Sequence, residues 1–160
     1  MAGTRMGVAF EASPCNDAVP SRADARWAGC VSVIVPVYNE VAHLDELLQA
    51  ILSSPVKKEI IIVDDGSTDG TREKLQAMPL ADDVSVVFHE KNCGKGAAIR
   101  TALGYARGEY VLIQDSDLEY DPQDYPALLE PLKQRHANVV TAYVPTGRSV
   151  GSDFFWARNY

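Results

Sequence analysis

Two aspartates, Asp115 and Asp117, have the types and spacing in this chain that are most suited to chemistry. They follow the apolar run 109–113, which is typical of a buried β-strand. Side chains alternate along an extended backbone, so two residues at this spacing point the same way. Their carboxylates repel each other unless one is protonated or a cation lies between them. Oxygen ligands favour Mg²⁺ or Mn²⁺, so the pair indicates a metal site, with a solvated turn as the alternative.

Asp121 lies close to this pair but has a different interpretation. It directly precedes Pro122, and this order is typical of a helix cap followed by the first helical residue. We therefore expect Asp121 to begin a helix rather than to bind the cation.

Strands and helices alternate along the sequence that must position these carboxylates. The predicted strands are 31–35, 59–63, 84–88, 109–113 and 138–142, and amphipathic helices lie between them. Leu44, Leu47, Leu48, Ile51 and Leu52 form the apolar stripe of the first helix, with Asn39 as its predicted cap. The alternation predicts an α/β fold with a mainly parallel sheet flanked by helices.

Ligands of such sheets bind outside the carboxyl ends of the strands. The turns expected there contain Tyr38, Glu40, Asp64, Asp65, residues 94–96 and residues 115–119. We expect these polar side chains to converge on one ligand, which strengthens the prediction of a metal site.

Length, composition and charge limit the classes of protein. A chain of 160 residues with 46% hydrophobic content suits one domain, and a net charge of −7 disfavours a nucleic-acid partner. Three widely spaced cysteines without a metal-ligand pattern favour a reducing cytoplasm. No apolar run is long enough to span a bilayer. Residues 1–29 lack any period and predict a flexible extension, followed by one domain over residues 30–160.

Several common nucleotide and hydrolytic sites are excluded. The turn 36–40 has no glycine for a dinucleotide, and residues 94–96 lack the spacing of a phosphate loop. His43, His89 and His136 are scattered, so we interpret them as surface or packing residues. The kind of site that is not excluded is one in which carboxylates hold a cation beside a phosphate-bearing ligand. This chemistry fits a nucleotide sugar, whose diphosphate gains negative charge as it leaves.

Three further residues have candidate roles with open alternatives. Asp65 could accept a hydrogen bond from a ring nitrogen of the base while Tyr38 lies against that base, or it could form an Asx turn with Gly66. Lys95 at a helix start could meet a phosphate or remain solvated. Cys93 is interpreted as an incidental loop thiol.

Three segments in order, 31–40, 60–71 and 114–122, resemble the motifs of family 2 glycosyltransferases with the GT-A fold. The resemblance covers residues 31–145, and the third segment is most similar to the polyprenyl-phosphate branch. It implies nucleotide-sugar contacts from Pro36, Tyr38, Glu40, Val63 and Asp65, and Gln114 and Ser116 beside the diphosphate. It also implies that Asp115 and Asp117 are catalytic and hold Mg²⁺ or Mn²⁺, with Glu119 as a third metal ligand.

The resemblance implies inverting transfer of a hexose from a GDP- or UDP-sugar to a polyprenyl (dolichyl or undecaprenyl) phosphate. The acceptor phosphate is already anionic, so no strong protein base is needed. The expected location is the cytoplasmic face of a membrane, where a partner chain could provide an anchor. The alternatives are a truncated nucleotide-binding module without transferase activity and a family 2 enzyme with a sugar acceptor.

The chain departs from the family pattern in two places. The family has Gly-Ser-Arg after the fifth strand, whereas Thr141, Ala142 and Tyr143 stand here, with Arg148 as the candidate replacement. Residues 154–159 resemble the start of the family's acceptor region, so we expect the acceptor half to be incomplete.

Overall fold

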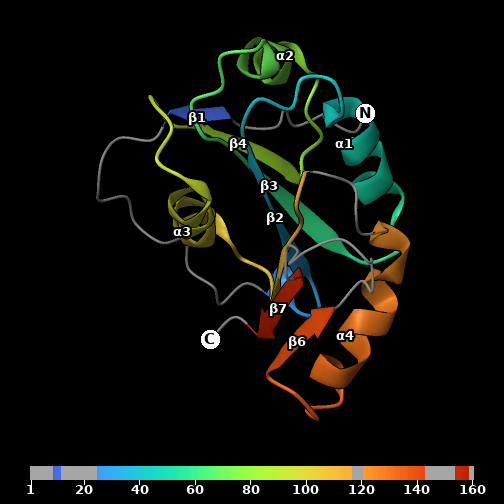
Figure 1. Ribbon diagram of the computed structural model, residues 1–160. Coiled ribbons are helices and arrows are strands. Elements are labelled where there is room, and N and C mark those ends of the chain that lie inside the picture. Colours follow the sequence, from blue (N-terminus) through green and yellow to red (C-terminus); the bar gives the residue numbers. More distant parts are fainter. Residues whose placement is uncertain (1–8, 12–24, 117–120, 143–153, 159–160) are drawn as a thin grey trace, which may run out of the picture.

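A seven-stranded sheet runs through the computed structural model, with strand order β1-β4-β3-β2-β5-β7-β6 (Figure 1). The structure describes residues 9–11, 25–116, 121–142 and 154–158. The strands are β1 (Ala9–Glu11), β2 (Val31–Val37), β3 (Lys58–Asp64), β4 (Val84–Phe88), β5 (Tyr110–Ile113), β6 (Val139–Ala142) and β7 (Phe154–Arg158). The strands β1 to β5 are parallel where they pair, which confirms the predicted α/β class.

The centre of the sheet is apolar on both faces. Every residue of β2 is buried, and Val33 pairs with Ile60 of β3 on one side and Leu112 of β5 on the other. A strand covered by helices on both faces needs a continuous apolar run rather than an alternating pattern. The runs that predicted these strands therefore form the centre of the core.

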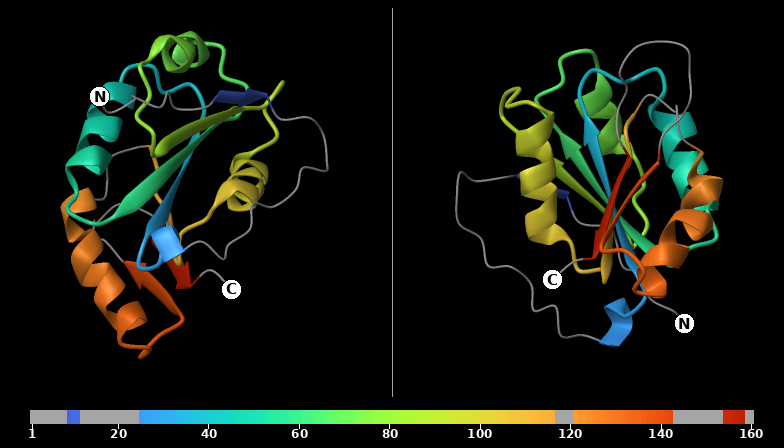
Figure 2. Two further views of the ribbon diagram at one scale, coloured as in Figure 1. Left: turned by 180° about the vertical axis from the view of Figure 1, so that it is seen from behind. Right: turned by 60° about the horizontal axis from the view of Figure 1, so that its bottom comes forward.

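Helices cover both faces of this sheet. They are α1 (Leu44–Ser53), α2 (Thr71–Ala77), α3 (Lys95–Tyr105) and α4 (Tyr125–Lys133), with short 3-10 helices η1 (Ala25–Trp27) and η2 (Pro122–Asp124). The right-hand view of Figure 2 shows α3 on one face of the sheet and α1 with α4 on the other. Ala98 and Ala102 pack α3 closely on its face, while leucines of α1 and α4 fill the opposite one.

Two details of the first helix differ from the prediction. Asn39 does not cap α1, which begins after His43 without a side-chain cap. Leu52 is 48% exposed, although it continues the apolar stripe. The predicted cap at Asp121 is confirmed, because its Oδ1 accepts a hydrogen bond from the Gln123 N–H at 2.9 Å.

β7 runs in the opposite direction to the other strands of the sheet. β7 lies between β5 and β6 and is antiparallel to both, so β6 does not pair directly with β5. The sequence predicted a strand at 138–142 but not this insertion. The backbone groups at this edge of β5 pair with β7, which lies farther along the sequence than the next predicted strand, 138–142.

The amino-terminal segment also contains described structure. β1 pairs with the edge strand β4, with Ala9 opposite Val86, and η1 precedes β2. The flexible extension expected for residues 1–29 stays a prediction. Without β1, the edge of β4 would present unpaired backbone groups. A short segment can pair with such groups even when its sequence has no alternating hydrophobic pattern. The domain boundary near residue 29 remains a prediction.

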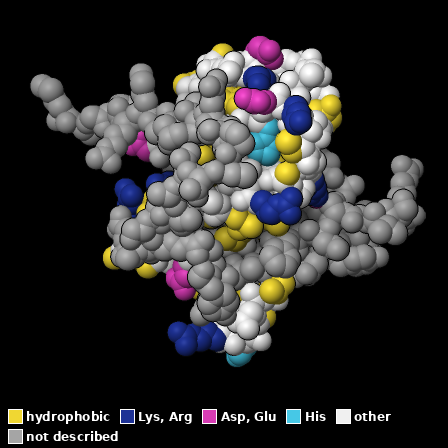
Figure 3. Space-filling model, turned by 90° about the vertical axis from the view of Figure 1, so that its left-hand side faces the viewer, with side chains coloured by type: hydrophobic (Ala, Val, Ile, Leu, Met, Phe, Trp, Pro, Cys, Tyr) yellow, Lys and Arg dark blue, Asp and Glu magenta, His cyan; other side chains and the backbone are white. Residues whose placement is uncertain are grey.

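The surface seen in Figure 3 is chemically mixed. The Lys and Arg side chains that the structure describes on this face are scattered among apolar and acidic ones, rather than gathered into one stripe. Among the described residues, no helix is long and apolar enough to cross a membrane.

Candidate functional site

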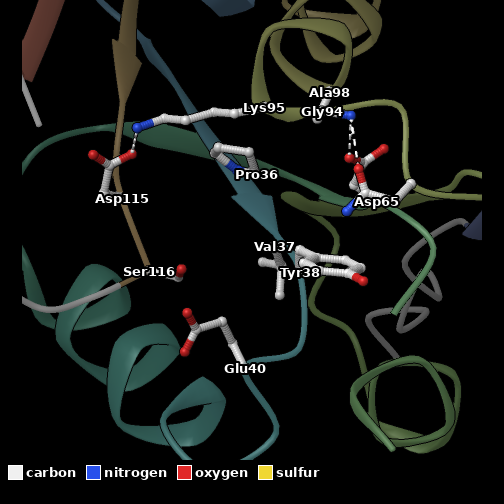
Figure 4. Close-up of a pocket in the computed structure, with 11 residues that line it drawn as sticks. Pro36, Val37, Tyr38, Glu40, Asp65, Gly94, Lys95, Ala98, Asp115 and Ser116 are labelled. Atoms are coloured by element: carbon white, nitrogen blue, oxygen red, sulfur yellow. Dashed lines mark hydrogen bonds and ion pairs between the residues drawn. The ribbon is translucent and has the colours of Figure 1, made fainter. Parts of the chain in front are cut away.

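A cavity of about 370 Å³ opens at the carboxyl ends of β2, β3 and β5 (Figure 4). It is lined by Pro36, Val37, Tyr38, Glu40, Asp65, Asn92, Gly94, Lys95, Ala98, Asp115 and Ser116. Six of these, namely Pro36, Tyr38, Glu40, Asp65, Asp115 and Ser116, are among the predicted site residues. The structure therefore brings them together where open parallel sheets bind ligands.

Asp65, the residue after β3, is 3% exposed and held by three N–H groups. Its Oδ1 accepts hydrogen bonds from His89 Nδ1 at 2.6 Å and from the Cys93 backbone at 3.0 Å. Its Oδ2 accepts one from the Gly94 backbone at 2.7 Å. Burial raises the pKa of this carboxyl, but the three hydrogen bonds outweigh it and hold the pKa below its usual value. Asp65 is therefore an ionised acceptor at neutral pH.

The predicted alternative for Asp65, an Asx turn with Gly66, does not form among these contacts. Asp64 stabilises the turn instead, because its Oδ1 accepts from the Ser67 N–H at 3.2 Å. The other oxygen of Asp64 pairs with Arg72 Nε at 2.9 Å.

The interpretation of His89 as a surface or packing residue missed a contact of the site. This residue follows β4, its side chain is 10% exposed, and its Nε2 lies 2.9 Å from Thr101 Oγ1 on α3. His89 thus connects Asp65 to the helix that covers this face. The only sequence signal was its position at the carboxyl end of a predicted strand.

The ligand atoms of Asp65, His89 and Cys93 all lie within 4.8 Å of one another. Such a set of oxygen, nitrogen and sulfur atoms can bind a metal. Here both carboxylate oxygens and both ring nitrogens already take part in hydrogen bonds. We therefore assign this cluster to holding the loop after β4.

Asp115 pairs with Lys95 across the cavity, with 2.6 Å between Oδ1 and Nζ (Figure 4). The carboxylate is buried, whereas the lysine side chain is 53% exposed. A buried carboxylate that already holds a cation is a fitting ligand for a divalent ion. Asp117 and Glu119, the other predicted metal ligands, lie outside the described residues, as does Arg148.

Gln114 and Val63 are not brought to the cavity. The Gln114 side chain is buried, where its Oε1 accepts a hydrogen bond from the Tyr125 hydroxyl at 2.5 Å and its Nε2 donates to the Asp115 carbonyl at 3.0 Å. Val63 is fully buried inside β3. Gln114 therefore supports the backbone that carries Asp115.

The turn after β2 is held by the loop before α2. The N–H groups of Asn39 and Glu40 donate to Ser67 Oγ and Thr71 Oγ1, each at 2.9 Å. Asn39 has a φ of 57°, and its Oδ1 accepts from the Thr68 N–H at 2.8 Å. These bonds fix the turn while the Tyr38 ring stays 46% exposed at the cavity, beside Asp65 (Figure 4).

Known proteins resemble this chain in sequence and in fold. It is 42% identical over 110 residues to the undecaprenyl-phosphate 4-deoxy-4-formamido-L-arabinose transferase of Pseudomonas aeruginosa, a match that covers 65% of this chain and 32% of that protein. The chain thus spans about a third of the length of the curated relatives it matches.

Two solved structures share the fold. TarS of S. aureus, in complex with UDP-GlcNAc, has 30% identity and a TM-score of 0.63 over 76% of this chain and 37% of that chain. The mannosyltransferase PcManGT of Pyrobaculum calidifontis, in complex with GDP-Man and Mn²⁺, has 36% identity and a TM-score of 0.53 over 61% and 30%.

The mainly parallel sheet with helices on both faces, which these solved structures share, agrees with the GT-A fold that the sequence motifs implied. The sequence matches the family described as Glycosyl transferase family 2 over residues 32–159, which is most of its length. The chain therefore belongs to glycosyl transferase family 2.

Proposed function

We propose that this chain binds the donor of a glycosyltransferase that moves a hexose from a GDP- or UDP-sugar to a polyprenyl phosphate. The observation that carries the proposal is the pairing of two sites in one cavity. Asp65 and Tyr38 form a place for a base, and Asp115 provides a cation ligand for a diphosphate. The curated relative from Pseudomonas aeruginosa supports the lipid acceptor, because its name specifies undecaprenyl phosphate.

The cavity has a distinct group for each part of the donor. The exposed Tyr38 ring can stack on the base while the ionised Asp65 accepts from the edge of that base. Glu40, also at the cavity, has a carboxylate suited to the hydroxyl groups of the ribose. Ser116 lies beside Asp115, where its hydroxyl can meet the diphosphate.

Asp115 would hold Mg²⁺ or Mn²⁺ together with Asp117 and Glu119. When bound, such an ion neutralises the charge that builds on the diphosphate as it leaves. Lys95 provides the same kind of charge from the chain itself. If a metal takes over Asp115, the lysine ammonium is free to meet a phosphate oxygen at the start of α3.

The transfer is a single displacement at the anomeric carbon. An oxygen of the acceptor phosphate forms a bond to that carbon as the bond to the nucleoside diphosphate breaks, and the configuration inverts. The second pKa of a phosphate monoester is about 6, so the attacking oxygen is anionic at neutral pH and needs no protein base. We place this reaction at the cytoplasmic face of a membrane, where a separate membrane-anchoring chain could assist, because the proposed acceptor is a lipid.

Calorimetric titration of the chain with UDP and GDP, with and without Mn²⁺, tests the donor site. We expect Mn²⁺-dependent binding of one nucleotide, and we expect Asp115→Ala and Asp117→Ala to abolish it while circular dichroism stays unchanged. Asp82→Ala, at an exposed acidic position away from the cavity, is the matched control. Binding that survives both substitutions and a chelator would contradict the metal assignment.

A transfer assay with polyprenyl phosphate then separates activity from binding. Incorporation of labelled sugar into the lipid supports the proposed reaction. Metal-dependent binding without incorporation favours the nucleotide-binding module, and incorporation into a sugar instead of the lipid favours a family 2 enzyme with a sugar acceptor.

A further inference from the structure

We infer that the base subsite selects uracil over guanine, because the hydrogen bonds around Asp65 leave this carboxylate one free acceptor position. His89 is the positioning residue that produces this selectivity. The inference rests on the proposed function and specifies its donor. Family membership does not decide the base, since similar structures hold UDP-GlcNAc in one case and GDP-Man in another.

An ionised carboxylate offers about four acceptor positions, two on each oxygen. His89 and the Cys93 backbone take both positions on Oδ1. The Gly94 backbone takes one position on Oδ2. One acceptor position therefore remains, and it lies on Oδ2.

The position of Asp65 brings this remaining acceptor to the ligand. Asp65 lines the cavity, and the Tyr38 ring lies beside it (Figure 4). A base that stacks on Tyr38 presents its edge, rather than its face, to the carboxylate. The donors on that edge must then match what Asp65 can accept.

Uracil, guanine and cytosine differ in their donors at this edge. Uracil has one ring N–H between two carbonyl groups, so a single acceptor satisfies it. Guanine has a ring N–H beside an amino group, and this pair matches a carboxylate with both oxygens free. Cytosine presents an amino group, which can donate to the free position, but beside it a ring nitrogen lone pair, which the carboxylate repels. A buried donor without a partner disfavours guanine, and the facing lone pairs disfavour cytosine.

His89 keeps Oδ1 occupied through contacts at both ends of its ring. A carboxylate only accepts, so Nδ1 must carry the hydrogen that faces Asp65. In the neutral ring, Nε2 then accepts from the Thr101 hydroxyl, which fixes the imidazole against α3. Arg72 also donates to the His89 carbonyl, so the backbone of this residue is held as well. Without the imidazole, Oδ1 would regain an acceptor position.

The test compares UDP, GDP and CDP in calorimetric titrations of the full chain with Mn²⁺. We expect UDP to bind at least about tenfold more tightly than GDP or CDP, since one unpaired buried donor has roughly that effect. In His89→Leu, which lacks the donor to Asp65, we expect the UDP-to-GDP preference to fall about tenfold. A loss of stability alone would weaken both nucleotides equally and leave this ratio unchanged.

His89→Asn is the matched variant, because its amide nitrogen can take the place of Nδ1 beside Asp65. We expect it to keep the preference for UDP, and it retains the test if His89→Leu does not fold. Equal or tighter binding of GDP by the unmodified chain, or an unchanged ratio in His89→Leu, overturns the inference while the donor site stands. Binding of none of the three nucleotides overturns the proposed function as well.

Discussion

At the scale of single residues, we expect the ion pair between Lys95 and Asp115 to influence how tightly the proposed divalent ion binds. The ammonium lies 2.6 Å from the carboxylate that we assign to the metal, so it competes with the ion for the same oxygen. Because the lysine is half exposed, the pair contributes only about 1 kcal/mol. We predict that Lys95→Met tightens Mn²⁺ binding in the absence of nucleotide by about fivefold, measured by calorimetry.

Nucleotide binding should respond in the opposite direction. Lys95→Met also removes the charge that we expect to meet a phosphate, so UDP or GDP should bind more weakly despite the tighter metal. Lys91→Met, at an exposed position on the loop before α3, is the control and should change neither affinity. Weaker Mn²⁺ binding in Lys95→Met would show that the two cations do not compete.

The depressed pKa of Asp65 predicts how stability changes with pH. Its folded pKa lies below the ordinary value of 3.8, so the carboxylate stabilises the fold above that pH. This contribution is lost as the pH falls through the folded pKa. We predict that the difference in free energy of unfolding between the unmodified chain and Asp65→Asn shrinks as the pH falls from about 5 to 3. Urea denaturation at each pH measures it, and a constant difference would contradict the assigned hydrogen bonds.

The sequence predicted the site residues that lie at the ends of strands, but not the side chains that form hydrogen bonds with them. The positions of Asp65, Tyr38 and Asp115 could be predicted because each residue comes soon after an apolar run ends, and the carboxyl ends of parallel strands lie at one edge of the sheet. The contact of His89 with Asp65 depends on the path of the loop after β4, and its contact with Thr101 depends on the rotation of α3. Neither the path of a loop nor the rotation of a helix about its axis produces a repeating pattern that can be recognised in the sequence.

At the scale of elements, Gly66 allows the loop after β3 to lie against the loop after β4. Its φ is +75°, and a Cβ there would lie 2.5 Å from the Asn92 nitrogen. Any side chain must therefore move the loop that carries the Cys93 and Gly94 donors to Asp65. We predict that Gly66→Ala lowers the free energy of unfolding by about 3 kcal/mol and weakens nucleotide binding.

Gly29 provides a matched control for Gly66. Its φ is +66°, but an added Cβ would meet no atom within 4 Å. Gly29→Ala therefore isolates the cost of the left-handed backbone, about 1 kcal/mol, without the collision. Equal losses of stability for the two variants, measured by denaturant titration, would contradict the close contact between the loops.

A buried ion pair joins the other end of the sheet. Glu59 in β3 is 1% exposed and accepts from Arg107 Nε at 2.8 Å and from Ser32 Oγ at 2.6 Å. The Arg107 guanidinium also stacks on the Trp27 ring, 4.1 Å from its centroid. We predict that Arg107→Met lowers the free energy of unfolding by about 3 kcal/mol, because it leaves Glu59 buried without its cation.

Arg100→Met is the control for Arg107, since Arg100 lies exposed on α3. Denaturant titrations should show almost no change for it. This network lies at the amino ends of the strands, so nucleotide affinity should be unchanged in both variants under conditions where they are folded. A selective loss of nucleotide binding in Arg107→Met would show that the two ends of the sheet are coupled.

At the scale of the whole molecule, the parallel part of the fold could be predicted and the antiparallel part could not. The strand predicted at 84–88 coincides with β4, and the strands predicted at 31–35 and 59–63 end within two residues of β2 and β3. The pairing of β7 with β5 joins segments more than forty residues apart, such as Val111 and Ala157. Apolar runs identify strands, but they do not specify which edge a distant strand will occupy.

β7 joins β6 to the rest of the sheet, so we expect the two strands to unfold together. Ala157 pairs with Val111 on one side and Val139 on the other, and a proline there cannot supply the backbone N–H that the ladder uses. We predict that Ala157→Pro removes the hydrogen-exchange protection of β6, since β7 is the strand that pairs with it among the described residues. β5 keeps its pairing with β2, so Asp65, Tyr38 and Asp115 should remain in place and Mn²⁺-dependent nucleotide affinity should change by less than about threefold. Loss of protection across β2 and β3 as well would show instead that the antiparallel strands and the donor site unfold as one cooperative unit.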